Sequence, residues 1–388
     1  RHRDYFLVTG GAEDAAPGPA SKPSLLVTGL AGALLLLCLA AAPGRAEEED
    51  KAAAETSLPL NKGLPVVVRT GLHILEVKSF DENEGTYQAT TDLRLTWTDL
   101  RLRYSPEQSI DSYKEFRSSR ADKEIAKLWI PRTRFANQEG EPSFTDRRLR
   151  IFPTGVVELI TRTTAKYKTP IDVEKFPFDH QRLELDIRVI EDTTSTVTLD
   201  YVQSDLDFTR AAKAMKLAGW NTSMVDLKRE IIFGWNGDRY AQVTAALKIS
   251  RQPAGVIAPI FIPLFASLMI PLLILWMNRI EAGVFVVEAF ELANIIIGGL
   301  FSVIALSFSV NSSYKSLSSG DNTVSRLFGL NYLTLAFSLG VVIVLFRLNL
   351  PKRLFNAYVQ EEIFKVCTWA IPVLALGTAA ALLLIAAV

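Results

Sequence analysis

The chain has 388 residues, with 42 basic and 42 acidic side chains and a formal net charge of zero. A nucleic-acid partner would need a basic face, and the only basic clusters are short ones beside apolar segments, so we exclude such a partner. Hydrophobic residues make up 49% of the chain, but charged residues crowd residues 45–251 and the C-terminal part is mostly apolar. The sequence therefore predicts a polar domain followed by a membrane domain.

An apolar run at residues 25–42 comes first. Lys22 precedes it, and small residues with Arg45-Ala46 follow it, which is typical of a secretory signal and its cleavage region. We therefore assign residues 1–46 to an N-terminal lead and signal peptide, and residues 47–63 to a linker. The alternative interpretation of the run is a fifth membrane helix.

Cysteine and histidine are scarce. Cys38 lies in the first apolar run and Cys367 in the last, so the polar domain is expected to fold without a disulfide. The three histidines, His2, His73 and His180, form no pattern with metal-ligand spacing. We expect no metal and no cofactor. No nucleophile–base pair or phosphate-binding loop indicates an enzyme.

Residues 64–251 alternate apolar and polar side chains with a period of two, as half-buried strands do. Turn-forming residues separate these runs at Asn83-Glu84-Gly85, at Pro153-Thr154-Gly155 and at residues 234–237. This spacing predicts an all-β, immunoglobulin-like sandwich of about ten strands. A helical pattern around residues 106–127 interrupts the strands.

Four apolar segments follow, each long enough to cross about 30 Å of hydrocarbon as a helix. They lie near residues 253–276, 284–310, 325–346 and 363–388, so we assign residues 252–388 to an all-α bundle of four transmembrane helices. Basic residues follow the first segment and separate the third from the fourth: Arg279, Arg347, Lys352, Arg353 and Lys365. By the positive-inside rule, the β-domain and the C-terminus are predicted on the outer side of the membrane.

Three local patterns occur in a fixed order in the β-region. They are Leu-Trp-Ile-Pro at residues 128–131, Arg-Leu-Arg-Ile-Phe-Pro-Thr-Gly-Val-Val at residues 148–157, and Lys-Phe-Pro-Phe-Asp-His-Gln at residues 175–181. In this order, and followed by four membrane segments, they resemble the pentameric ligand-gated ion channels of the Cys-loop receptor superfamily. No cysteine flanks the Phe-Pro-Phe-Asp loop, so the resemblance is to the bacterial branch, which lacks the loop disulfide.

The resemblance covers about residues 64–388 and includes the spacing of Pro253, Pro263 and Trp276 in the first membrane segment. It implies a homo-pentamer in the bacterial inner membrane that responds to a small-molecule or ion ligand and conducts monovalent cations. Two alternatives stay open. One is a non-conducting sensor of the same fold; the other is a transporter, although transporters usually bury ionisable residues in mid-membrane.

The ligand site that the resemblance implies lies between subunits. Residues that match it by position are Arg94, Trp97, Phe135 and Arg162, and the hairpin near residues 232–241 adds Phe233, Trp235 and Tyr240. Aromatic rings attract a cation through their faces, but no specificity for an amine follows. The alternative for Trp97, as for Trp129, is the core of the sandwich.

The Phe-Pro-Phe-Asp loop is predicted to couple the two domains. Pro177 sets a turn between Phe176 and Phe178, which can insert into an apolar surface, and presents Asp179 at the tip. Arg251 ends the last β-segment, and the resemblance implies that it pairs with Asp179. The alternative is a lone loop acid and an arginine that contacts lipid headgroups.

The second apolar segment is the predicted pore helix, and its register is ambiguous. Counting forward from Trp276 makes Glu281 the acid at the pore entrance. Counting back from the polar outer linker, residues 311–323, makes Glu291 the entrance acid, and Glu288 lies one turn before it. We favour Glu291, since five copies would form an acidic ring that attracts cations. The predicted pore face is Ile295, Gly299, Ser302, Leu306 and Ser309. The more apolar stripe Ile296, Leu300, Val303, Ser307 and Val310 suits lipid or helix contacts, and ordinary helix packing is the alternative for both.

Overall fold

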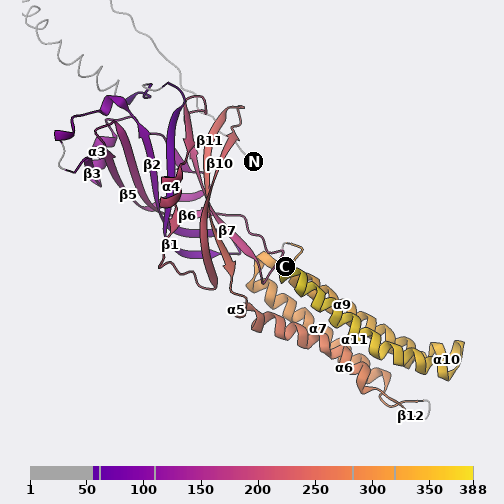
Figure 1. Cartoon of the computed structure of the whole chain (residues 1–388). Helices are drawn as coiled ribbons and strands as arrows, with labels where there is room; N and C mark the ends of the chain where they lie inside the picture. The colour runs from indigo at the N-terminus through magenta and orange to yellow at the C-terminus, as the bar shows by residue number, and fades with distance from the viewer. Residues whose placement is uncertain (1–55, 61–62, 109–110, 282–283, 319, 388) are drawn as a thin grey trace, which may run out of the picture. The chain divides into compact units, whose positions relative to one another are not determined.

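A computed structural model describes residues 56–60, 63–108, 111–281, 284–318 and 320–387. The predicted lead and signal peptide lie outside these residues, as do parts of the predicted linker. The described chain contains a β-sandwich followed by four long apolar helices (Figure 1). The predicted fold class, an all-β sandwich joined to an all-α bundle of four helices, is confirmed.

The larger of the two sandwich sheets has seven strands. Its order is β3 (Lys114–Arg117), β5 (Gln138–Ile151), β6 (Val156–Lys168), β2 (Thr86–Thr98), β1 (Val66–Asp81) and β8 (Val197–Asp200), and the short β9 (Arg210–Ala211) also pairs with β1. Consecutive strands β1 and β2, and β5 and β6, pair antiparallel, as short hairpin connections allow. The sheet therefore follows largely from local connections.

The smaller sheet has four strands, in the order β10 (Trp220–Phe233), β11 (Arg239–Arg251), β7 (His180–Val189) and β4 (Thr133–Phe135). Every second residue of β7 from Gln181 onward is buried, which is the period of a strand with one face on a core. Leu183, Leu185 and Ile187 of β7 pack with Leu72 and Leu149 of the larger sheet in one apolar cluster. Burial of these side chains holds the sheets together without a disulfide.

The helix predicted around residues 106–127 does not form as a unit. In its place are a 3₁₀ turn at Pro106–Gln108, strand β3 and the short helix α3 (Ser119–Ile125). Phe116, which falls inside the predicted helix, lies in β3 opposite Leu149 of β5. Pairing with a neighbouring strand therefore overrides a weak helical pattern.

The first membrane helix begins with α5 (Ala254–Val256) and a π-type turn, η3 (Ile257–Phe261), and continues as α6 (Ile262–Met277). Pro259 and Pro263 lack amide hydrogens, so the regular i to i−4 ladder is interrupted at the π-type turn. The connection to the next helix contains a two-stranded hairpin of β12 (Ile280–Glu281) and β13 (Val284–Phe285). This hairpin occupies residues that the sequence analysis had placed at the start of the second span.

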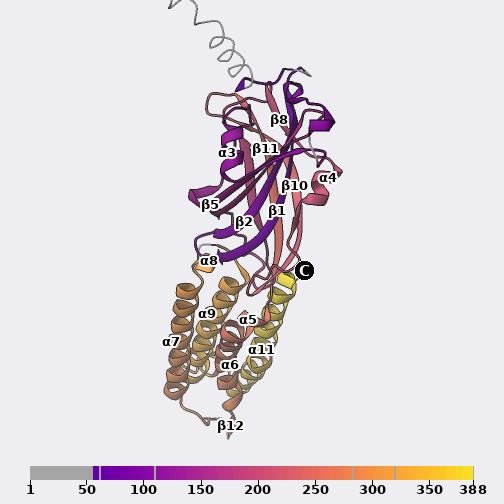
Figure 2. The same ribbon diagram turned by 90° about the vertical axis from the view of Figure 1, so that its left-hand side faces the viewer.

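The second long helix is α7 (Ala289–Ser313), and the short α8 (Lys315–Ser318) follows it. The third span is α9 (Thr323–Val341) with its continuation η4 (Val342–Arg347), and α10 (Leu350–Leu354) leads to the last helix, α11 (Ala357–Ala387). Both α7 and α11 pack against α6 and α9, and Figure 2 shows the four long helices side by side. The bundle thus places α7 and α11 on different sides of the α6–α9 pair.

Candidate functional site

Arg251, the last residue of β11, carries a buried guanidinium group next to the first membrane helix. Its Nε lies 2.6 Å from Oδ1 of Asp179 and its Nη2 lies 3.0 Å from Oδ2, so the ion pair is bidentate. Arg251 is 7% exposed and Asp179 is 2% exposed. A buried pair of this kind is costly to break, because removing either partner leaves an uncompensated charge away from water.

Glu82, in the turn between β1 and β2, is a second carboxylate partner of Arg251. Its Oε1 and Oε2 lie 3.1 Å from Nη1 and 2.6 Å from Nη2. Burial by itself would lower the pKa of Arg251, but the hydrogen bonds to Asp179 and Glu82 outweigh it and raise the pKa. The sequence analysis missed Glu82, since its neighbours indicated only a turn.

Two aromatic rings lie against the same guanidinium group. Its Cζ is 4.3 Å from the ring centroid of Trp220 and 4.8 Å from that of Phe176. Trp220 lies directly opposite Arg251 in the pairing of β10 with β11. Such contacts contribute about 2 kcal/mol when they are desolvated. Arg251 thereby joins three separate segments: the β1–β2 turn, the Phe-Pro-Phe-Asp loop and the start of β10.

Gln181 holds the Asp179 carboxylate in place. Its Nε2 donates to Oδ2 of Asp179 at 2.7 Å, and its Oε1 accepts a hydrogen bond from the backbone N–H of Asp172 at 3.0 Å. Because Gln181 is the first buried residue of β7, the loop carboxylate is tied to the rigid sheet. A movement of the sheet therefore moves the ion pair with it.

Phe176 also reaches the membrane helices. Its ring is fully buried, stacks on Phe261 at 6.5 Å between centroids, and lies 6.1 Å from the ring of Tyr314. Phe261 belongs to the first membrane helix, and Tyr314 directly follows α7. The neighbouring Pro177 is buried and Phe178 is half-buried. One loop thus contacts Arg251 and the outer ends of two membrane helices.

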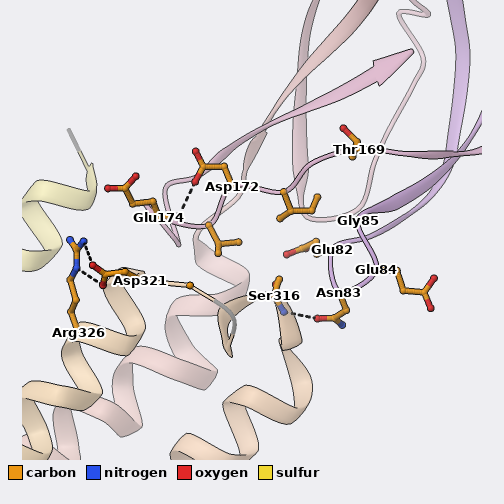
Figure 3. A pocket seen from close by; sticks show the side chains of 13 residues that line it. Glu82, Asn83, Glu84, Gly85, Thr169, Asp172, Glu174, Ser316, Asp321 and Arg326 are labelled. Atoms are coloured by element: carbon orange, nitrogen blue, oxygen red, sulfur yellow. Dashed lines mark hydrogen bonds and ion pairs between the residues drawn. The ribbon is translucent and has the colours of Figure 1, made fainter. Parts of the chain in front are cut away.

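Turns of the β-domain and the outer linker of the bundle line a pocket of about 620 Å³ (Figure 3). On one side, Oδ1 of Asn83 accepts a hydrogen bond from the backbone N–H of Ser316 at 3.3 Å. On the other, the hydroxyl of Thr323 donates to the carbonyl of Glu174 at 3.3 Å. These two hydrogen bonds are each 3.3 Å long. Arg251 with Glu82, Asp179, Gln181, Trp220 and Phe176 forms what we call the Arg251 cluster. Its ion pairs are shorter, and Arg251 and Asp179 are buried.

The seven residues predicted to bind ligand do not gather at one place in a single subunit. Trp97 and Phe135 are buried in the sandwich core, where Trp97 packs edge-on against Trp129 and Phe135 against Tyr167. For Trp97 the core alternative is therefore the one that the structure supports, because its ring is 2% exposed.

Arg94 and Arg162 lie on neighbouring strands of the larger sheet and are engaged in ion pairs. Arg94 contacts the buried Asp205 at 2.8 Å, and its guanidinium lies 4.2 Å from the ring centroid of Phe208 in α4 (Gln203–Phe208). Arg162 makes two hydrogen bonds of 2.8 Å to Asp92.

The remaining three candidates lie in the β10–β11 hairpin of the smaller sheet. Phe233 and Trp235 are exposed, and Trp235 fully so, while Tyr240 is half-buried. Arg239 lies 5.5 Å from the ring centroid of Phe233. A fully exposed tryptophan leaves a large apolar surface in water, which is typical of a residue that contacts a partner or a ligand.

The predicted pore face of α7 agrees only in part with the packing of the helix. Gly299 is buried, and a Cβ there would lie 3.3 Å both from Cγ2 of Ile270 and from Cδ2 of Leu335. Ile295, Ser302 and Ser309 are exposed, and Leu306 is half-buried. Gly299 therefore faces α6 and α9 inside the subunit, where a Cβ would be in tight contact with side chains of both helices.

The buried face of α7 is formed by Leu292, Ile296, Gly299, Val303 and Val310. Three of these belong to the stripe that the sequence analysis had assigned to lipid or helix contacts. Glu291 is in the first turn of the helix, and Glu288 precedes that turn as the N-cap residue; both are exposed. Glu281 lies in the β12–β13 hairpin, outside the helix.

Comparison with known proteins decides the family. Residues 54–253, more than half of the chain, match the model of the neurotransmitter-gated ion-channel ligand-binding domain. The chain belongs to the pentameric ligand-gated ion channels. This confirms the resemblance described above, and the absence of cysteine beside the Phe-Pro-Phe-Asp loop fits a member without the loop disulfide. The family consists of membrane-embedded pentamers rather than enzymes.

Several relatives carry the names of ligand-gated channels. The chain is 28% identical over 232 residues to a proton-gated ion channel of Gloeobacter violaceus, and the alignment covers 60% of this chain and 62% of that protein. It is 20% identical over 220 residues to the gamma-aminobutyric acid receptor subunit theta of Mus musculus, covering 56% of this chain and 33% of that protein. It is 26% identical over 206 residues to the neuronal acetylcholine receptor subunit alpha-2 of Homo sapiens, covering 51% of this chain and 36% of that protein. The chain thus spans less than two thirds of the length of each.

Proposed function

We propose that this chain, a member of the pentameric ligand-gated ion channels, is one subunit of a homo-pentameric, cation-selective channel of the bacterial inner membrane. Ligand binding between β-domains would open a pore lined by α7. The Arg251 cluster carries this proposal. It joins the ligand-binding sandwich to the membrane helices through a short, buried network, and Phe176 extends that network to Tyr314 at the outer end of α7. A protein that only anchored its β-domain would not need such a connection.

The ligand site is proposed to form between subunits, from two surfaces that are separate in one chain. The β10–β11 hairpin would supply Phe233, Trp235 and Tyr240 from one subunit. The outer face of the larger sheet would supply Arg94 and Arg162 from the next. This division explains why exposed aromatic rings and ion-paired arginines lie on different sheets. Trp97 and Phe135 are left out of the proposal, because both are buried in the core.

The pore face of α7 is proposed to be rotated relative to the predicted one. With 100° per residue, the side directly opposite the buried residues Leu292, Ile296, Gly299, Val303 and Val310 carries Asn294, Gly298, Phe301, Ala305 and Phe308. All five are exposed in the subunit. Only 22% of the apolar window of α7 is buried, compared with 50% for the first span, so α7 has the most surface left for neighbouring subunits and a pore.

This face suggests how the pore closes. Asn294, Gly298 and Ala305 are small or polar, and they would leave room for a hydrated ion. Rings of Phe301 and Phe308, which are 67% and 77% exposed in one subunit, would narrow the pore with apolar surface. Apolar constrictions close pores by excluding water. Glu291, just before this stripe, would form the acidic ring at the cytoplasmic entrance.

Gating then follows from differential affinity. A ligand shifts the balance between closed and open states only to the extent that it binds one state more tightly. Closure of the β10–β11 hairpin on a neighbouring subunit would favour one arrangement of the sandwich. Trp220 begins β10 and Arg251 ends β11, and the two residues lie opposite each other. The arrangement of the sandwich would therefore be passed through this pair to the Phe-Pro-Phe-Asp loop and to α7.

The test is electrical recording in oocytes or planar bilayers. With acid pulses and small amines as trial ligands, a sodium chloride gradient should give a reversal potential near that of sodium. Glu291→Gln should shift it toward that of chloride, because five carboxylates are removed, whereas Glu361→Gln, a half-buried acid of α11, should not. A wild-type anion current, or an unchanged reversal potential in Glu291→Gln, contradicts the cation assignment. Absence of current under every condition favours a non-conducting sensor.

A further inference from the structure

The connection between the first membrane helix and α7 is held in place at the end of the bundle that lies farthest from the β-domain (Figure 2). Its strands β12 and β13 pair antiparallel, and the backbone N–H of Val286 donates to the carbonyl of Arg279 at 3.0 Å. The segment that enters α7 is therefore paired with the segment that leaves α6. Glu288, one turn before the proposed entrance acid Glu291, follows this segment directly.

A buried amide closes the base of the hairpin. Asn278, which follows α6, is 3% exposed. Its Oδ1 accepts a hydrogen bond from the backbone N–H of Val287 at 3.1 Å, and its Nδ2 lies 3.5 Å from the carbonyl oxygen of the same residue. Buried polar groups in native proteins have partners, and a side chain that meets both polar groups of one residue restricts where that residue lies. Asn278 thus fixes the residue that precedes Glu288.

Phe285 of β13 is anchored by two aromatic rings from other spans. Its ring centroid lies 4.1 Å from that of Phe346 in η4 and 5.3 Å from that of Phe364 in α11, and the latter two rings are 5.6 Å apart. Phe346 and Phe364 are buried. Aromatic pairs at these distances stabilise a contact beyond the area that they bury. We call Asn278, Phe285, Phe346 and Phe364 the inner seat, since together they hold the start of α7.

The Glu288 side chain has no support of its own. It is exposed, it accepts no capping hydrogen bond at the start of α7, and within the described part of the chain it forms no ion pair. The location of its carboxylate is therefore set by the backbone that the inner seat holds.

Two cationic side chains share a pocket with Glu288. The pocket has a volume of about 560 Å³, and its lining includes Glu288, Phe285, Arg347 at the end of η4 and Lys352 of α10. Both cations are exposed, and neither forms an ion pair with any described residue. Opposite charges attract, and an ion pair would cancel much of the field of the carboxylate. The acid stays apart from both cations as long as the backbone before it is held.

We propose that the inner seat is a positioning device for conduction, and that it keeps the Glu288 carboxylate free of Arg347 and Lys352. The importance of a free carboxylate rests on the proposed function, in which negative charge at the pore mouth concentrates cations. When the seat is loosened, Glu288 would pair with a cation, and the mouth would lose negative charge in each of five subunits. The residues of the seat act through Glu288 and need not touch the permeating ion.

A chemical test reports the position of Glu288 without any current. In the purified full-length chain, a carbodiimide joins a carboxylate to a lysine amine as an amide where the two groups are in contact, and mass spectrometry of the peptides measures the product. Phe285→Ala should give several times more Glu288–Lys352 product than the wild type. Phe355→Ala, which removes an exposed ring between α10 and α11, should match the wild type. Equal yields in all three proteins overturn the proposal.

A second loosened variant covers the case in which Phe285→Ala does not assemble. Asn278→Leu removes the amide clamp and keeps a side chain of similar size, so it should give the same increase in the Glu288–Lys352 product. A folded Asn278→Leu pentamer with the wild-type yield overturns the proposal.

Recordings in dilute salt measure the consequence for the ion current. Phe285→Ala should lower the single-channel sodium conductance about twofold, because the mouth attracts fewer cations. In a background that carries Arg347→Gln and Lys352→Gln, the same change should have no effect, since Glu288 then has no cation to pair with. General damage to the pore would lower the conductance equally in both backgrounds, and that result overturns the proposal. If no form conducts, the proposed function fails, and the amide yields alone decide the role of the seat.

Discussion

Arg251 shows how a single side chain connects segments that are distant in sequence. Glu82, Asp179 and Trp220 approach it from three different turns or strands, and Phe176 adds a contact that continues into the helices. The sequence suggested one of these four contacts, Asp179, because a family motif marks it. The other three depend on strand pairing and on loop positions that no local pattern records.

Trp220 offers a test of the aromatic part of the cluster. Trp220→Ala should raise the ligand concentration for half-maximal current about tenfold, because a desolvated cation–π contact of about 2 kcal/mol is lost on the guanidinium that is proposed to couple the domains. Trp220→Phe keeps a ring and should recover most of the response. Dose–response recordings of both variants measure this, and equal shifts for alanine and phenylalanine would show that the ring face is not what matters.

His73 gives a prediction for pH. Its pKa lies below the ordinary 6.5 because of burial first and then the nearby Arg210 and Arg162, with Asp92 acting in the opposite direction. The folded protein therefore binds this proton less readily than the unfolded chain does, so stability falls as pH drops below about 6.5. His73→Gln should reduce the fall in melting temperature between pH 7 and 5.5. The exposed His180→Gln is the control, and an identical fall in all three proteins would contradict the assignment.

At the scale of elements, α7 is the proposed pore helix. Apolar content by itself does not clearly separate the faces of this helix, since the pore face predicted from the sequence also contains Ile295 and Leu306. Packing does so, because α6 and α9 cover one side and Gly299 permits their close approach. The hairpin β12–β13 explains the ambiguity in register: it lies between the first span and α7, so counting forward from Trp276 reaches Glu281, which is outside α7.

Cysteine substitution tests the proposed face. In open channels, Gly298→Cys and Ala305→Cys should be modified by a small charged thiol reagent and should lose most of their current, since both positions lie on the proposed pore face. Ile296→Cys and Val303→Cys, on the buried face, should be unaffected. Measurements are made in a Cys367→Ala background. Strong block in Ser302→Cys with none in Ala305→Cys would restore the pore face predicted from the sequence.

At the scale of the whole molecule, the β-domain and the bundle meet in a charged but mostly compensated junction. A buried guanidinium with two carboxylates tolerates the loss of one acid better than the loss of the base. Removing the base leaves one buried and one partly buried negative charge, and breaking a buried pair costs about 3–5 kcal/mol.

Variants of the acids at this junction should therefore change gating, whereas a variant of the arginine should impair folding. Glu82→Gln and Asp179→Asn should fold and require more ligand to open, since one carboxylate of Arg251 remains in each. Arg251→Gln should lower the yield of folded pentamer and the melting temperature. Size-exclusion profiles and thermal melts, followed by recordings, separate these outcomes. Wild-type gating in both Asp179→Asn and Arg251→Gln would remove the cluster from the coupling route.

The sequence by itself determined the sandwich, the four apolar helices and the position of the coupling loop. These features depend on periodicity, on segment length and on a short motif, all of which are local. The tertiary structure alone decided that Trp97 and Phe135 are buried, that Glu82 and Trp220 join Arg251, and that Gly299 faces the bundle. The physical reason is that exposure and pairing depend on what other segments cover, and a periodic pattern shows that a residue has a buried side without showing which neighbour buries it.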